Sequence, residues 1–117
     1  MEGCRWPVNP SRKRNPPEPV VKEVAGIFRV LSGPTRIRII HVLLARGERP
    51  VGEIAEELGM GVAAVSNQLR KMADLGIVGK MVRGNFAFYR VTDPCVGVLL
   101  HRAYCLSEDG KTRRRGR

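Results

Sequence analysis

The sequence predicts a mainly α-helical fold that contains one β-hairpin, with elements in the order α-α-α-α-β-β-α. Apolar residues recur at helical spacing through residues 20–75, and the tight glycine-containing turn "LGMG" separates two of the helical segments. Apolar and polar residues then roughly alternate over residues 77–91. Two short helices around such a turn form a helix-turn-helix, and a hairpin directly after it makes a winged helix-turn-helix. At 117 residues the chain has room for one such domain.

The chain begins with a proline-rich segment. Residues 1–18 hold few apolar side chains, which predicts a flexible basic arm. Pro19 fits the first turn of a helix, and an apolar stripe over residues 20–31 continues that helix. The "SGP" that follows ends it, and Pro34 begins a second helix that ends at Gly47. We expect the buried face of this second helix to hold Ile37, Ile40, Leu43 and Leu44.

The helix-turn-helix depends on three residues at a fixed mutual spacing. Ala55 is small at the point where the two helices are expected to cross. Gly59 lies in the turn, where a positive φ is needed. Val65 is expected to fill the corner between the helices, at the start of an apolar stripe. Together these residues predict that the second helix of the motif covers about residues 61–75.

The hairpin and a last helix complete the predicted domain. The "RGN" in the middle of the alternating segment is typical of a hairpin turn. Asp93 and Pro94 then provide an N-cap and a first helical residue. We therefore predict a folded domain over residues 19–109 and a basic tail over residues 110–117.

The charge of the chain favours a polyanionic partner. The net charge is +10, and half of it lies in residues 110–117. Basic tails bind nucleic acid because each phosphate contact releases counterions. The alternative is that the charge only keeps the protein soluble.

Several other classes of protein do not fit the sequence. Three cysteines without framework spacing argue against a disulfide-stapled secreted domain. The N-terminus has no apolar segment of the kind that signal peptides carry, and no apolar run approaches the ~20 residues of a membrane span. No phosphate loop, zinc-protease motif or catalytic triad stands out, so we do not expect an enzyme. We expect a cytoplasmic protein with no membrane partner.

The second helix of the motif carries the residues expected to read DNA. Recognition helices place their N-terminal part on base edges in the major groove. Ser66, Asn67 and Gln68 have side chains that hydrogen-bond to bases, and the two amides suit adenine. Arg70 and Lys71 are expected to hold phosphates, and the hairpin tip to reach the minor groove or the backbone. The alternative is a merely solvated polar face. The predicted DNA-binding residues are Ala63, Ala64, Ser66, Asn67, Gln68, Arg70, Lys71, Lys80, Arg83 and Asn85.

Three stretches give the chain a family resemblance: "LSGPTRIRIIHVLL" at 31–44, "VGEIAEELGMGVAAVSNQLRKMADLGIV" at 51–78 and "RGNFAFYRV" at 83–91. Over residues 20–109 the chain resembles the ArsR/SmtB family of winged-helix repressors. The resemblance implies a homodimer that forms through the first and last helices. It also implies binding to a near-palindromic operator in double-stranded DNA and release when a ligand binds the dimer.

The reading helix departs from the family pattern in two ways. Gly61 and Ala63 stand where family members often carry serine, which weakens the N-cap. Asn67 stands where many relatives have histidine. The fold prediction is unaffected, but the operator sequence does not follow from the resemblance.

The resemblance also directs attention to two sensing positions. In the family, one is a cysteine pair on the first helix of the motif, which Pro50 and Gly52 replace here, so this site is expected to be absent. The other is a set of ligands on the last helix. Asp93 and Asp109 match that pattern, Cys95 replaces a histidine, and Leu106 stands where a second histidine belongs.

Three hypotheses remain for the last helix: packing alone, thiol oxidation or reactive-sulfur sensing, and binding of a metal or metalloid. A helix N-terminus favours the thiolate form of a nearby cysteine, so Cys95 is a candidate to pair with a partner-chain cysteine or with Cys4. His101 and Cys105 are spaced i,i+4 and share a helix face. A metal would be a divalent ion such as zinc or nickel. The candidate sensing residues are Asp93, Cys95, His101, Cys105 and Asp109.

The sequence therefore predicts a homodimeric transcriptional repressor that binds a specific sequence of double-stranded DNA. A metal ion or thiol oxidant that acts at the last helix is expected to release it from DNA. The alternative is a winged-helix module that binds RNA or a protein partner and senses no ligand. The polar, basic reading face argues against that alternative.

Overall fold

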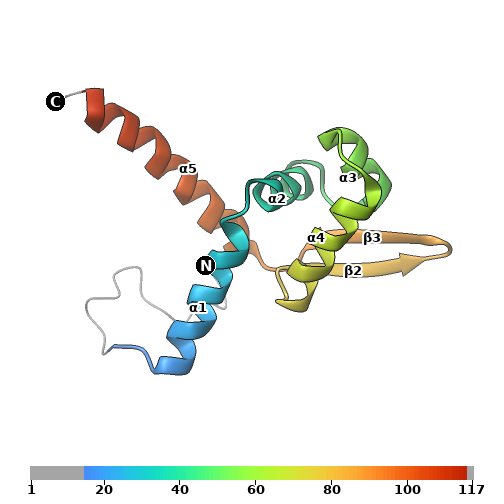
Figure 1. The fold of residues 1–117 in the computed structure, drawn as a ribbon, viewed down its shortest axis with the longest axis horizontal. Helices are drawn as coiled ribbons and strands as arrows, with labels where there is room; N and C mark the ends of the chain where they lie inside the picture. Colours follow the sequence, from blue (N-terminus) through green and yellow to red (C-terminus); the bar gives the residue numbers. More distant parts are fainter. Residues whose placement is uncertain (1–14, 116–117) are drawn as a thin grey trace.

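The computed structural model describes residues 15–115. Figure 1 shows α2, α3, α4 and the hairpin gathered into one body, with α1 below it and α5 leading away from it. Most of the predicted arm 1–18 and the last two residues of the predicted tail lie outside the described residues. The elements are α1 (Glu18–Leu31), α2 (Pro34–Arg46), β1 (Arg49–Pro50), α3 (Val51–Leu58), α4 (Val62–Asp74), β2 (Val78–Arg83), β3 (Phe86–Val91) and α5 (Pro94–Arg115).

The winged helix-turn-helix prediction is confirmed, with one addition to the element order. A two-residue strand, β1, pairs antiparallel with β3, so the sheet has the strand order β1-β3-β2. The predicted order has no such strand between the second and third helices. Proline is tolerated at the edge of a sheet because the edge lacks one set of ladder hydrogen bonds, and Pro50 occupies that position opposite Phe88.

The predicted turn of the helix-turn-helix is confirmed in detail. Gly59 has φ 64°, and it ends α3 in the left-handed conformation. The N–H of Gly59 donates to Glu56 O at 3.1 Å, and that of Met60 donates to Ala55 O at 2.9 Å. These two hydrogen bonds form a Schellman motif, which satisfies the last carbonyls of α3. Ala55 and Val65 are buried, as expected for the crossing point and the corner.

The core lies between α2, the helix-turn-helix and the base of the hairpin. The prediction for the buried face of α2 is partly wrong, because Leu44 is exposed and Ile39 and Val42 are buried instead. Helix α2 contacts α1, α3, α4 and β3, so its buried surface is broader than one stripe. The fully buried large side chains are Ile39, Ile40, Ile54, Val65, Leu69, Met72 and Val78.

The first and last helices leave apolar surface uncovered in a single chain. Val21, Val24, Ile27 and Phe28 of α1 are exposed, and so are Val98, Tyr104 and Leu106 of α5. Contiguous exposed apolar side chains mark interaction surfaces. Helix α5 also continues to Arg115, beyond residue 109, where we expected the folded domain to end. Among the described residues, no helix has the length and apolar character needed to cross a bilayer.

Candidate nucleic-acid interface

Helix α4 has one buried face and one open face. Val65, Leu69 and Met72 are completely buried, and their spacing turns the opposite face of the helix toward solvent. Of the predicted contact residues, Ala63, Ala64, Asn67, Arg70 and Lys71 are exposed on the open face, Ser66 is half-buried at its edge, and Gln68 is half-buried on the flank that faces α2. The N-cap is Gly61, which makes no side-chain capping bond, as its lack of a hydroxyl predicts.

Two arginines engage the amides of α4. Arg36, near the start of α2, donates from Nε to Gln68 Oε1 at 2.6 Å and from Nη1 to the Val30 carbonyl at 3.4 Å. Arg70 donates from Nη2 to Asn67 Oδ1 one helical turn away. Sequence reasoning missed Arg36, because nothing in the spacing of residues in α2 indicates a contact with a helix more than thirty residues later.

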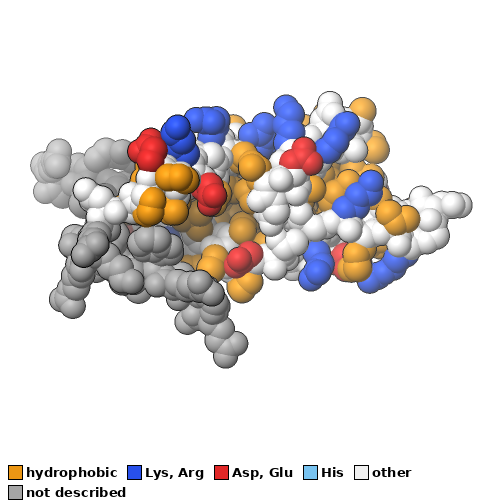
Figure 2. All heavy atoms as spheres, turned by 90° about the horizontal axis from the view of Figure 1, so that it is seen from below, with side chains coloured by type: hydrophobic (Ala, Val, Ile, Leu, Met, Phe, Trp, Pro, Cys, Tyr) orange, Lys and Arg blue, Asp and Glu red, His pale blue; other side chains and the backbone are white. Residues whose placement is uncertain are grey.

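A groove separates α4 from the hairpin. Its lining residues are Ser66, Arg70, Ala73, Asp74, Lys80 and Tyr89. The structure thus brings Ser66, Arg70 and Lys80 together, although Lys80 comes from β2 and the other two from α4. Lys80 pairs with Tyr89 across the hairpin, and the buried Tyr89 anchors that strand against the core. Figure 2 shows lysine and arginine side chains on both halves of the molecule, including the half that carries α4 and the hairpin, with acidic side chains among them.

The hairpin tip divides its polar residues between two faces. Gly84 has φ 61°, and with Asn85 it forms the two-residue turn. Lys80 and Arg83 are three residues apart along β2, so their side chains point to opposite faces of the sheet. Arg83 pairs with Glu48 at 2.8 Å and lies 5.4 Å from the centre of the Phe88 ring. Arg83 therefore does not lie in the groove with Lys80, and its ion pair with Glu48 is worth only about 0–1 kcal/mol because the Arg83 side chain is largely exposed.

The candidate sensing residues on α5 form two pairs and one separate residue. The N–H of Cys95 donates to Asp93 Oδ1 at 2.8 Å, so Asp93 caps the helix as predicted. Further along the helix, Cys105 Sγ lies 3.7 Å from His101 Nε2. Asp109 is exposed, one turn beyond Cys105. Within the described part of the chain, no three or more histidine, cysteine or acidic side chains are grouped to hold a metal ion.

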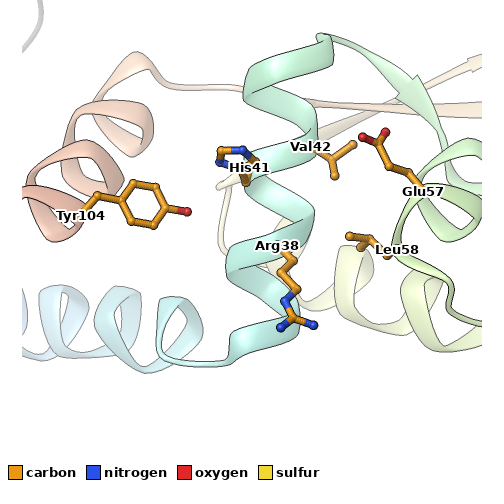
Figure 3. A pocket seen from close by; sticks show the side chains of 6 residues that line it. All are labelled: Arg38, His41, Val42, Glu57, Leu58 and Tyr104. Carbon is orange, nitrogen blue, oxygen red and sulfur yellow. The ribbon is translucent and has the colours of Figure 1, made fainter. Parts of the chain in front are cut away.

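A hollow between α2, α3 and α5 shows how the last helix contacts the domain body. Arg38, His41 and Val42 of α2, Glu57 and Leu58 of α3, and Tyr104 of α5 line it (Figure 3). The rings of His41 and Tyr104 meet edge to face, with centroids 6.2 Å apart and planes at 82°. This contact gives α5 an aromatic partner on α2.

Comparison with known proteins now identifies the chain. The model of a family described as "Bacterial regulatory protein, arsR family" matches residues 33–80, which cover α2, the helix-turn-helix and the start of the hairpin. A probable mercury resistance operon repressor from Streptomyces lividans is 38% identical over 73% of this chain and 67% of its own length. A homolog of the cadmium resistance regulator CadC from Staphylococcus aureus is 33% identical, over 79% of this chain and 72% of its own. The chain belongs to the ArsR family.

A solved structure of an ArsR-type repressor supports the same placement. The antimony-specific transcriptional repressor AntR has a TM-score of 0.76 to this chain and 35% sequence identity, and the match covers 91% of this chain and 97% of that one. These three similar proteins are named for responses to mercury, cadmium and antimony. The ArsR fold of this chain therefore extends over nearly the whole described length.

Proposed function

We propose that this ArsR-family protein is a homodimeric transcriptional repressor that binds double-stranded DNA through α4 and the hairpin. The observation that carries the proposal is the open face of α4, where hydrogen-bonding side chains share a groove with Lys80 of the hairpin. The helix-turn-helix fixes this face rigidly against the core through Ala55 and Val65. A recognition helix so exposed fits the major groove, with basic residues beside it on the phosphates.

A second copy of the chain is the partner that the exposed faces of α1 and α5 fit best. Phe28 is 55% exposed and Leu106 is 64% exposed, which is unusual for large apolar side chains that have no partner. A two-fold axis between two copies would repeat the same patch on both sides. It would also present two α4 helices about 34 Å apart, which requires a near-palindromic operator.

We further propose that thiols on α5 sense the signal that releases the protein from DNA. Similar proteins named for metal resistance support this, and so does the closeness of His101 to Cys105. A tetrahedral site needs four ligands, and one chain does not group even three among its described residues. The described residues of one chain therefore do not fit a complete metal site. A thiol oxidant acting on Cys95 or Cys105 needs no such grouping.

A charge-matched pair of variants tests the DNA-binding role. Arg70→Ala and Arg38→Ala each remove one positive charge, but Arg70 lies on the open face of α4 and Arg38 lines the hollow of Figure 3. In gel shifts on duplex DNA we expect Arg70→Ala to lower the affinity and to reduce the salt slope by about 1. Arg38→Ala should behave as the unmodified protein. Equal losses in both variants, or tighter binding to RNA than to duplex DNA, would contradict the proposal.

The sensing role is tested on the same complexes. Cys95→Ser and Cys105→Ser are compared with the unmodified protein for release from DNA by oxidants, a persulfide and a panel of metal ions. We expect one compound to release the unmodified protein and to fail on at least one variant. Release that is identical in all three proteins would remove these thiols from the mechanism.

A further inference from the structure

We propose that the amides of α4 read guanine rather than adenine, and that Arg36 sets this preference without touching DNA. The inference rests on the proposed function, because it takes α4 as the element that reads base edges. The inference is based on which amide atoms of Asn67 and Gln68 already form hydrogen bonds within the protein. An amide side chain offers one accepting oxygen and two N–H donors, and the identity of the base depends on which of them faces the groove.

The amide of Gln68 is oriented from outside its own helix. Its Oε1 accepts from Arg36 Nε at 2.6 Å, and Gln68 is half-buried. Arg36 is itself held, since its Nη1 donates to the Val30 carbonyl and its aliphatic stem lies over Gly33. A guanidinium has five N–H donors and no acceptor, so only the oxygen of the amide can face it. The N–H groups of Gln68 consequently point away from Arg36.

The amide of Asn67 is oriented in the same sense from within α4. Its Oδ1 accepts from Arg70 Nη2, so its N–H groups are the atoms left for a base. The helix supplies no carboxylate acceptor along Val62–Ala73, and Asp74 stands at its end. Both amides thus turn their N–H groups away from the arginines, and each oxygen faces a charged donor, which leaves it poorly placed to accept from a base. Hydrogen bonds to charged groups are the stronger ones, so a neutral base donor does not displace them easily.

The base edges in the major groove distinguish the two cases. The usual recognition of adenine by Asn or Gln requires the amide oxygen to accept from N6–H and an N–H to donate to N7. Recognition of cytosine likewise requires an acceptor on the protein. Thymine presents one acceptor, O4, whereas guanine presents two, O6 and N7, so guanine is the best match for amides that offer two N–H groups. The adenine preference expected from residue type alone is therefore replaced by guanine.

The test measures base preference, which a merely structural role of Arg36 would not change. The full-length protein is used to select its operator from random duplexes, and Gln68→Met identifies the base pair that Gln68 contacts. We expect guanine there, and we expect its replacement by adenine or by 7-deazaguanine to weaken binding about tenfold. In Arg36→Met the amide is released, so the guanine-to-adenine ratio should fall below about threefold or invert. Arg38→Met is the matched control and should keep the ratio of the unmodified protein.

The outcomes separate this inference from the proposed function. Adenine at the Gln68-dependent position, no position that depends on Gln68, or an unchanged ratio in a folded Arg36→Met would overturn the inference alone. No binding to duplex DNA would overturn the proposed function and the inference with it. If Arg36→Met fails to fold, Gln68→Glu decides, because it keeps a partner for Arg36 and removes the N–H donors. Gln68→Glu should lose the guanine preference, and its retention would overturn the proposal.

Discussion

Two glycine-to-alanine substitutions on the same short helix should change stability in opposite directions. Gly59 ends α3 with φ 64°, whereas Gly52 lies within α3 in helical conformation. A Cβ at either position would meet no atom within 4 Å, so neither substitution creates a clash. The difference between them is therefore the backbone conformation alone, which makes Gly52→Ala a matched control for Gly59→Ala.

The expected magnitudes follow from that conformation. The left-handed region costs an L-residue about 1–2 kcal/mol, and the loss of unfolded-state freedom returns about 0.4–1 kcal/mol. The midpoints of these ranges differ by about 0.8 kcal/mol, so Gly59→Ala should lower the free energy of unfolding by about 0.5–1 kcal/mol. Gly52→Ala replaces glycine inside a helix and should raise it by about 0.5–1 kcal/mol. At about 4–8 °C per kcal/mol for a domain of this size, the two melting temperatures should differ by roughly 4–16 °C.

Circular dichroism of the purified protein gives the measurement, with urea unfolding as the second probe. All samples need the same protein concentration, because dimerisation makes the apparent stability concentration-dependent. Shifts of the same sign, or a Gly59→Ala protein as stable as the unmodified one, would show that the turn does not depend on the positive φ of Gly59.

Three further predictions concern the partners of the protein. Phe28→Lys places a charge on the exposed face of α1 and should convert the dimer to a monomer in analytical ultracentrifugation; an unchanged sedimentation coefficient would remove α1 from the interface. Asn67→Ala should alter the base preference at particular operator positions while sparing affinity for unrelated duplexes, because Asn67 is predicted to contact bases; a uniform loss on all sequences would contradict that role. Deletion of residues 111–117 removes five positive charges and should make the salt dependence of DNA binding shallower; an identical slope would exclude the tail from binding.

The backbone of this domain was predictable because it follows from local spacing. The helix-turn-helix needs a small residue at the crossing, a left-handed residue in the turn and an apolar residue in the corner. Ala55, Gly59 and Val65 meet those needs in one short stretch. The hairpin is likewise indicated by the alternation of apolar and polar residues and by a turn that contains glycine. Each of these signals depends on residues that are near one another in sequence.

The features that sequence reasoning missed depend on distant partners. Strand β1 is two residues long and contains Pro50, so it exists only because β3 lies beside it. Leu44 has the periodicity of a core residue, yet it stays 43% exposed beside Gly97 of α5. The sequence predicts that Arg83 contacts DNA but not that it pairs with Glu48, a contact that follows from the sheet that brings the two together. No period or propensity encodes such contacts.

The base preference of this protein, like the missed features, depends on residues that are distant in sequence. The residue types of α4 alone favour adenine, because Asn and Gln are free to present both an oxygen and an N–H group. Their orientation is set by Arg36 and Arg70, and the first of these lies on another helix. Under the proposed mechanism, ArsR relatives with the same α4 sequence but another residue in place of Arg36 would prefer a different base. Operator specificity in this fold is then a property of the contact between α2 and α4, and the sequence of α4 alone does not determine it.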